Sequence, residues 1–351
     1  MSKKEKIMVK IEDLKVTFYN KAKKTHNTVI RNTGFELYEK EVLAIIGESG
    51  SGKSVITSTL IGLLSNAAVI EEGRVIVDGI DVTKFDESDW EESELRGRVI
   101  SQVFQNPMTA LNPTMKIGLQ LIEGALINFR SASKKDAKQD AINLMLRVGI
   151  TNANQVMKLY PHQLSGGMRQ RVCIAAALLC QPKIIIFDEP TTALDPTIQA
   201  EILELIREIK DVFNVSIIFI SHDLGVVGSI ADRIAIMYAG KIIEYGKSKE
   251  VLYNSKHPYT RGLIQSMPDV NLGQKLYSIP GSVPSNFNNI IGDAFVTRNE
   301  YALDIDFVAH PPFFKISNTH FVASWLYDSR AIKINVPDII KKRHHQFKKQ
   351  H

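Results

Sequence analysis

The chain has 351 residues, of which 44% are hydrophobic and 23% charged, values typical of a soluble globular protein with room for more than one domain. No apolar run approaches the ~18 residues that a membrane-spanning helix needs. The formal net charge of +5 is mild and gathers at the two ends, MSKKEK and KKRHHQFKKQH, which we expect to be solvated.

Neither the first residues nor the cysteines indicate an oxidising compartment. MSKKEKIMVKIEDL lacks the apolar core and cleavage site of a secretory signal, so we expect the protein in the cytoplasm. Cys173 and Cys180 lie seven residues apart in a predicted helix with apolar neighbours. This pattern favours two buried thiols over a disulfide or a pair of metal ligands.

The first part of the chain predicts strands around one helix. Residues 7–46 alternate in the manner of strands and end in the apolar run VLAII at 42–46. A helix is predicted at 55–64, and GRVIVDGIDVT at 73–83 is typical of an antiparallel hairpin.

The middle of the chain predicts helices and then alternating strands and helices. Residues 114–160 carry apolar side chains at three- and four-residue spacing. KIIIFDEP at 183–190 predicts a strand, followed by a helix at 197–213 and a strand at 216–220. Strands that alternate with helices predict a parallel sheet.

The predicted fold class is α/β, with a parallel sheet, an antiparallel β subdomain and an inserted helical subdomain. We expect a core domain over 1–250, with the helical subdomain at about 106–163. Beyond about residue 250 the chain changes to turns that contain Pro and Asn, so residues 251–351 are expected to form a separate C-terminal extension.

A phosphate-binding loop is predicted at 47–54, where GESGSGKS follows the buried strand and opens the helix. The glycines let the backbone curl round a β-phosphate, and Lys53 supplies positive charge to the β- and γ-phosphates. The Ser54 hydroxyl can coordinate Mg²⁺. The residues of this loop are Gly47, Glu48, Ser49, Gly50, Ser51, Gly52, Lys53 and Ser54.

Two adjacent carboxylates, Asp188 and Glu189, directly follow a buried strand, at the end where α/β sheets bind ligands. They would repel each other without a cation. We therefore expect Asp188 to hold Mg²⁺ through a water molecule and Glu189 to accept a proton from the water that attacks the γ-phosphate.

Two further polar residues are expected near these carboxylates. His222, with Asp223 beside it, follows the strand at 216–220 and is expected to contact the γ-phosphate and align Glu189. The amide of Gln105, in VFQNP, can coordinate Mg²⁺ and contact the attacking water. Gln105 stands at the entrance to the helical subdomain, which would let the nucleotide state move that subdomain.

A second glycine pair lies in LSGGMRQR at 164–171. Ser165, Gly166 and Gly167 open a helix, and a helix N-terminus attracts a phosphate. This segment supplies no lysine and no metal ligand, so by itself it is half of a phosphate site.

GESGSGKS, SQVFQNP, LSGGMRQR, IIIFDEP, TTALD and SHD occur in that order over residues 10–250, and the combination resembles the ATP-binding-cassette (ABC) ATPases. The resemblance implies a P-loop NTPase fold that binds ATP and Mg²⁺. It also implies that two cassettes pack head to tail, and that the signature LSGGMRQR of one caps the γ-phosphate held by the loop of the other.

The resemblance assigns roles to two more positions. Asp195, in TTALD, is expected at the seam between the two cassettes. Phe18 aligns with the aromatic residue that stacks on adenine, with Tyr19 as the alternative. A core role for Phe18 is the third possibility.

FQNPMTALNP, LSGGMRQRVCIA and HPYTRGLI are similar to the ATPases of oligopeptide and dipeptide importers, specifically their D-type subunit. This similarity implies a peripheral protein on the cytoplasmic face of the cell membrane. The implied partners are two transmembrane permease subunits, a second, F-type cassette and, indirectly, an extracellular peptide-binding lipoprotein. A nucleic-acid partner is not expected.

The extension departs from a pattern found in many of these relatives, in which four cysteines bind an iron–sulfur cluster. The corresponding residues here are Asp293, Asn299, Asp306 and Ser324. Their hard oxygen atoms cannot hold a cluster that needs sulfur ligands, so we expect none; a hard-metal site is the alternative. The extension is expected to be held by apolar residues, namely Phe295, Tyr301, Phe307, Phe313, Phe321 and Trp325.

Two other functions stay open at this point. A soluble cassette ATPase that acts on ribosomes or nucleic acid would explain the basic ends, but such proteins usually carry two cassettes or a long coiled coil, and this chain has one cassette and no sustained heptads. An importer of another cargo, such as a dipeptide, nickel, an antibiotic peptide or a peptide pheromone, is equally compatible with the motifs.

Overall fold

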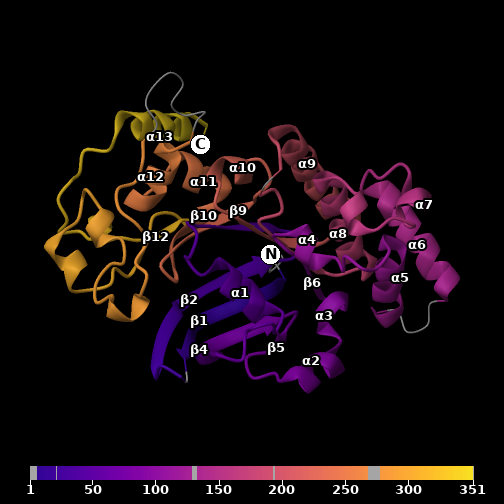
Figure 1. The fold of residues 1–351 in the computed structure, drawn as a ribbon. Helices are drawn as coiled ribbons and strands as arrows, with labels where there is room; N and C mark the ends of the chain where they lie inside the picture. The colour runs from indigo at the N-terminus through magenta and orange to yellow at the C-terminus, as the bar shows by residue number, and fades with distance from the viewer. Residues whose placement is uncertain (1–5, 21, 129–132, 193, 268–276, 351) are drawn as a thin grey trace. The chain divides into compact units, whose positions relative to one another are not determined.

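The computed structural model describes residues 6–20, 22–128, 133–192, 194–267 and 277–350 (Figure 1). The chain divides into two compact units, and each is described by itself. Unit 1 comprises Met1–Met8, Leu37–Glu41 and Asp78–Ile220. Unit 2 comprises Val9–Glu36, Val42–Val77 and Ser221–His351.

Parallel strands form the centre of unit 1. β7 (Ile184–Asp188) lies between β6 (Ile100–Val103) and β8 (Ser216–Ser221) and pairs with both in parallel register. Every residue of β7 and β8 is buried, as expected for parallel strands covered on both faces. The predicted parallel sheet is confirmed for these strands.

Helices make up most of the rest of unit 1. The predicted helical region at 114–160 contains α5, α6 and α7, and α5, α6 and α8 pack against one another (Figure 1). Unit 1 also contains the two-residue strand β5 (Ile80–Asp81). The helices are α2 (Glu87–Ser93), α3 (Leu95–Arg98), α4 (Pro107–Ala110), α5 (Ile117–Asn128), α6 (Lys134–Arg147), α7 (Ala153–Val156), α8 (Gly166–Leu179) and α9 (Pro196–Phe213).

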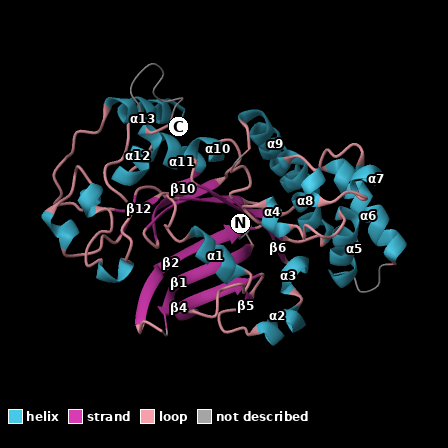
Figure 2. Cartoon of the chain, viewed as in Figure 1, coloured by secondary structure: helices cyan, strands magenta, loops and turns pink. Residues whose placement is uncertain are grey.

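Unit 2 contains the predicted antiparallel strands and a mixed sheet. β1 (Ile7–Asn20) pairs antiparallel with β4 (Ala68–Val77), and β2 (Thr25–Tyr38) lies on its other side, as Figure 2 shows. In the mixed sheet β3 and β9 are parallel and the other neighbours antiparallel. Its strands are, in spatial order, β11 (Phe313–Lys315), β12 (Phe321–Ala323), β10 (Lys241–Lys247), β9 (Arg233–Tyr238) and β3 (Val42–Ile46).

The first helix of unit 2 is shorter than the sequence predicts. α1 (Lys53–Leu60) starts directly at the glycine loop and stops before Gly62, which has a φ of 66°. The N–H of Leu63 bonds back to the carbonyl of Ser58, a glycine-dependent helix ending. The other helices are α10 (Leu224–Val227), α11 (Ser248–Tyr253), α12 (Pro258–Gln265) and α13 (Asp338–Gln350).

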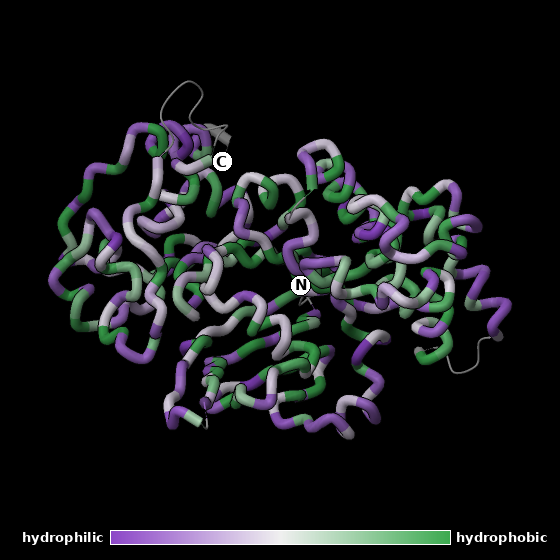
Figure 3. Tube along the Cα trace, in the orientation of Figure 1, coloured by the Kyte–Doolittle hydropathy of each residue, from purple (hydrophilic) through white to green (hydrophobic). Residues whose placement is uncertain are grey.

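The basic tail is a docked helix, so the expectation of a solvated end is wrong for one of its faces. α13 packs on α11, with Ile340 buried and the Arg343 guanidinium 4.7 Å from the ring centre of Tyr253. Figure 3 shows α13 as mostly hydrophilic, and Lys342 is exposed. The buried Ile340, the stem of Arg343 and a 3.1 Å contact between Nε2 of His344 and the carbonyl oxygen of Ser255 hold one face of this otherwise polar helix in place. Residues 1–5, which hold most of the other basic segment, lie outside the described residues.

The two cysteines are free, as predicted, but only Cys173 is buried and Cys180 is half-buried. Cys173 lies within α8 and Cys180 directly follows it. Burial raises the pKa of the Cys173 thiol to about 12 and also raises that of Cys180. Among the described residues, none of the helices combines the length and the apolar character needed to cross a membrane.

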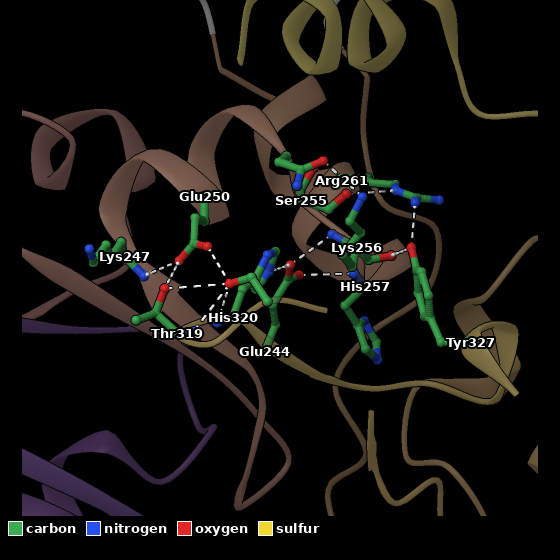
Figure 4. Close-up of polar contacts among 12 residues, drawn as sticks. Glu244, Lys247, Glu250, Ser255, Lys256, His257, Arg261, Thr319, His320 and Tyr327 are labelled. Atoms are coloured by element: carbon green, nitrogen blue, oxygen red, sulfur yellow. Dashed lines mark hydrogen bonds and ion pairs between the residues drawn. The ribbon is translucent and has the colours of Figure 1, made fainter. Parts of the chain in front are cut away.

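A buried carboxylate holds the C-terminal region, residues 251–351, to β10 (Figure 4). Glu244 has no exposed surface and accepts the backbone N–H groups of Lys256 at 2.7 Å and His257 at 2.9 Å. Its carboxylate also lies 2.8 Å from Nε2 of His320. Nearby, Glu250 accepts the hydroxyl of Thr319 at 2.7 Å. These contacts join β10, the start of α12 and the segment before β12.

The expectation that six aromatic residues hold the extension together is only partly right. Phe295 is buried, and Tyr301, Phe321 and Trp325 are half-buried. Phe307 and Phe313 are 56% and 48% exposed, so they contribute little to a core. The polar contacts of Glu244 and Glu250 also hold the extension in place.

Stability is expected to depend on pH through His257. Its ring is fully buried and its Nδ1 accepts the N–H of Tyr259 at 3.1 Å, and burial lowers its pKa to about 4. A histidine whose pKa is lower in the folded state stabilises the protein above its unfolded pKa of about 6.5, and this contribution is lost as the pH falls toward 4. The loss is on the order of 3 kcal/mol.

His257→Asn keeps an acceptor at this helix start and removes the titration. We expect its thermal unfolding midpoint to fall less than that of the wild type between pH 6.5 and pH 4. His345→Asn, at an exposed position of α13, is the control and should follow the wild type. Parallel curves for wild type and His257→Asn would contradict the prediction.

Candidate functional site

The phosphate loop of unit 2 has a shape that only glycines allow. A Cβ at Gly47 would lie 2.3 Å from the carbonyl oxygen of Met237. Gly50 and Gly52 have φ values of 80° and 105°, and Gly52 is the N-cap of α1. The loop therefore leads directly into the N-terminus of a helix, the arrangement that binds phosphate.

Lys53 and Ser54 occupy the first turn of α1. The Lys53 side chain is buried, and its Nζ donates to the carbonyl oxygens of Gly47 at 2.7 Å and Glu48 at 3.0 Å. Its charge is thus held over the start of the loop. Ser54 is exposed, with its hydroxyl at the same helix end.

Sequence reasoning missed two residues that contact this loop. The N–H of Glu48 donates to the hydroxyl oxygen of Tyr259 at 3.0 Å. The Glu48 carboxylate accepts from Nη1 of Arg298, with both oxygens at 3.1 Å. These partners lie 211 and 250 residues away in the sequence, so no local pattern points to them.

In unit 1 the structure brings Gln105 and Glu189 together. Asp188 ends β7 and is buried, and Glu189 follows with a φ of 46°, an uncommon backbone conformation for a glutamate. Its Oε2 accepts Nε2 of Gln105 at 3.1 Å and the hydroxyl of Thr192 at 3.0 Å. Two donors therefore fix the direction of this carboxylate.

The two glycines of the signature serve different purposes. Ser165 is the N-cap of α8, and its hydroxyl accepts the N–H of Met168 at 3.3 Å. A Cβ at Gly167 would lie 3.0 Å from Cγ2 of Ile198, so this glycine permits close packing against α9. At Gly166 the nearest atom would be 3.8 Å away. Packing against the described part of unit 1 therefore does not require a glycine at 166.

The remaining predicted residues have local contacts. Asp195 is the N-cap of α9, and its Oδ1 accepts the N–H groups of Thr197 at 3.1 Å and Ile198 at 3.0 Å. His222 is exposed directly after β8. Asp223, expected to accompany it, caps α10 by accepting the N–H of Gly225 at 2.8 Å.

Phe18 and Tyr19 lie near the end of β1 in unit 2. Phe18 is half-buried and pairs with Ala68 of β4. Tyr19 is 42% exposed, its hydroxyl donates to Glu71, and its ring centre is 5.9 Å from that of His26. Phe18 and Tyr19 are therefore neighbours at the end of one strand, and the choice between them stays a prediction.

The four oxygen-bearing residues of the extension each accept a backbone N–H. Asp293 accepts from Phe295 at 3.0 Å, Asn299 from Tyr301 at 3.0 Å, Asp306 from Leu303 at 2.7 Å and Ser324 from Leu326 at 3.4 Å. Burial raises the pKa of Asp293 to about 6. Within the described ranges, no group of three or more His, Cys, Asp or Glu residues is arranged to hold a metal ion.

Two family models match the chain. Residues 30–192 match "ABC transporter", and residues 243–305 match "Oligopeptide/dipeptide transporter, C-terminal region". The structure resembles the ATP-binding cassette MJ0796, solved as a dimer bound to ADP and Pi, with a TM-score of 0.61 and 26% identity over 69% of this chain and 99% of that one. These matches define a nucleotide-binding ABC cassette of α/β fold, as predicted.

Curated relatives narrow the class. The dipeptide transport ATP-binding protein DppD of Lactococcus lactis subsp. cremoris is 48% identical over 97% of this chain and 96% of its own length. The oligopeptide transport ATP-binding protein AmiE of Streptococcus pneumoniae is 44% identical over 100% of this chain and 98% of its own length. The chain belongs to the ABC transporter ATPases, in the group that carries the oligopeptide/dipeptide transporter C-terminal region.

Proposed function

We propose that the chain is the ATP-binding and ATP-hydrolysing subunit of an importer of oligopeptides. The observation that carries the proposal is the fixed Glu189 carboxylate, held by Gln105 and Thr192 at the end of a buried strand in a chain with a complete phosphate loop. The names of the relatives support peptides as the cargo.

The chain's own residues supply the steps of hydrolysis. The loop N–H groups and Lys53 hold the β- and γ-phosphates, and Phe18 stacks on the adenine. Glu189 takes the proton of the attacking water while the bond between the γ-phosphorus and its bridging oxygen breaks. Gln105 contacts the same water, and His222 contacts the γ-phosphate.

The proposed Mg²⁺ ligands fit a hard cation. Ser54, Gln105 and Asp188 offer hydroxyl, amide and carboxylate oxygens, and Mg²⁺ prefers such oxygens together with water and phosphate. The ion, when bound, neutralises charge on the phosphates. Asp188 is buried, so a nearby cation would offset the cost of its charge.

The signature is proposed to act on the ATP of a second cassette. Ser165, Gly166 and Gly167 form a helix N-terminus, and among the described residues a Cβ at Gly166 would meet only Leu194, at 3.8 Å, so a methyl group has room there. Asp195, which caps α9, is proposed to lie at the seam. The dimer of the related cassette supports this arrangement.

The proposed assembly lies on the cytoplasmic face of the cell membrane. Two permease subunits, an F-type cassette and, indirectly, an extracellular binding lipoprotein complete it. The proposed domain limits are 1–250 for the cassette, with the helical subdomain at about 106–163, and 251–351 for the extension. We propose that the extension holds no iron–sulfur cluster, because Asp293, Asn299, Asp306 and Ser324 offer oxygen and no sulfur.

Glu189→Gln is expected to keep ATP binding and to slow hydrolysis roughly 10²–10⁴-fold, the usual contribution of a general base. The measurement is steady-state phosphate release with the partner cassette present, next to ATP affinity by titration calorimetry. Glu208→Gln, at an exposed carboxylate of α9, is the control and should keep wild-type turnover. Near-normal turnover in Glu189→Gln would defeat the assignment.

Gly166→Ala separates folding from the proposed role of the signature. The new Cβ has room, and alanine favours a helix over glycine by about 1 kcal/mol, so the thermal midpoint should not fall. ATPase activity of the assembled pair should drop, because the methyl group meets the incoming phosphate. Gly167→Ala, which crowds Ile198, should be less stable than Gly166→Ala. Full activity in Gly166→Ala would exclude the close approach.

The partners can be identified directly. A pull-down of the full chain from its native membrane in mild detergent, followed by mass spectrometry, is expected to recover two multi-span permeases and a second cassette. Ribosomal proteins in place of permeases would leave the ATPase chemistry standing and defeat the transport assignment.

A further inference from the structure

Glu48 places a carboxylate inside a loop that binds phosphate. An unpaired negative charge there would repel a nucleotide, because like charges a few ångströms apart interact strongly near a protein surface. The structure shows how this charge is controlled: the N–H, the carbonyl oxygen and the carboxylate of Glu48 each have a partner. Two of these three partners come from the C-terminal region of unit 2.

Arg298 is the partner of the carboxylate, and its guanidinium is held firmly. The Arg298 side chain is 5% exposed. Its Nε donates to the carbonyl oxygen of Pro280 at 2.7 Å, and its Nη1 donates to the hydroxyl of Tyr238 at 3.2 Å. The guanidinium carbon also lies 5.7 Å from the ring centre of Tyr238 and 5.8 Å from that of Phe295. Such a pre-placed cation loses little freedom when it binds Glu48.

Tyr259 is the partner of the N–H, and it too is fixed. Its ring is fully buried, 4.8 Å from Tyr238 and 5.4 Å from Phe295 between ring centres. Burial raises the pKa of its hydroxyl, so the group stays a neutral phenol whose oxygen accepts the N–H of Glu48. Tyr259 sits in the first turn of α12, the helix that Glu244 fastens to β10.

The third partner connects Glu48 to the lysine of the loop. Nζ of Lys53 donates to the carbonyl oxygen of Glu48 at 3.0 Å. A continuous set of contacts therefore runs from the C-terminal region, through Tyr259 and Arg298, to Glu48 and on to Lys53.

We propose that Arg298 and Tyr259 are positioning residues for nucleotide binding. They hold Glu48 with its carboxylate neutralised and its carbonyl oxygen against Lys53, so that ATP affinity depends on the C-terminal region. The inference rests on the proposed role of the loop and Lys53 in holding ATP, and it adds a dependence that the cassette motifs do not contain.

The experiment measures the Kd of ATP with Mg²⁺ by titration calorimetry on the full chain. Arg298→Met leaves the Glu48 carboxylate without its cation, and we expect the Kd to rise about tenfold, the effect of losing one charge-assisted contact. The double variant Glu48→Gln with Arg298→Met removes the unpaired charge, and its Kd should return to within about threefold of the wild type. A merely structural role for Arg298 would leave the double variant as weak as the single one.

A matched control and a milder variant keep the test independent of folding. Arg343→Met removes another arginine of the C-terminal region, one whose contacts are with α11: it bonds the carbonyl oxygen of Leu252 at 3.1 Å and lies over Tyr253. It should lower the thermal midpoint and keep the wild-type Kd. Tyr259→Phe removes one oxygen and leaves the N–H of Glu48 unpaired, and its Kd should rise about threefold or more.

The outcomes separate this inference from the function on which it rests. If Lys53→Ala weakens ATP binding while Arg298→Met binds as tightly as the wild type, the positioning role is overturned and the nucleotide loop stands. If Arg298→Met is weak and the double variant shows no recovery, the positioning role is also overturned. If Lys53→Ala itself binds ATP like the wild type, the proposed function fails and the inference fails with it.

Discussion

In unit 2 one buried carboxylate, that of Glu244, ties the start of α12 to β10. Glu244 has no contact with solvent, and two backbone N–H groups and His320 offset the cost of burying its charge. Those N–H groups belong to the start of α12 and to the residue before it. Fixing them sets where α12 begins and, through it, where Tyr259 stands.

In unit 1 a carboxylate is likewise oriented by a few hydrogen bonds. Glu189 adopts a left-handed backbone conformation, and its side chain is then directed by Gln105 and Thr192. The backbone of Glu189 is thus in an unfavourable conformation at a position where its carboxylate must point in one direction. Gly166 of the signature is the opposite case, because the described neighbours in unit 1 leave room for a Cβ there and do not account for a glycine.

Much of this could be predicted because the responsible residues are neighbours in sequence. The loop at 47–54, the buried strands and the carboxylates at 188 and 189 are local patterns, and the structure has them where they were expected. The docking of α13 and the exposure of Phe307 could not be predicted, because they depend on which surfaces meet after folding. The pairing of Glu48 with Arg298, 250 residues apart, belongs to the same class.

The Glu48–Arg298 pair also constrains how such a chain can evolve or be recombined. A cassette that changes the second residue of its phosphate loop to a neutral one leaves a buried guanidinium without its anion, and the reverse change strands a carboxylate. The two positions should therefore vary together among homologues. A chimera that joins one cassette to the C-terminal region of another would need both residues to come from the same parent.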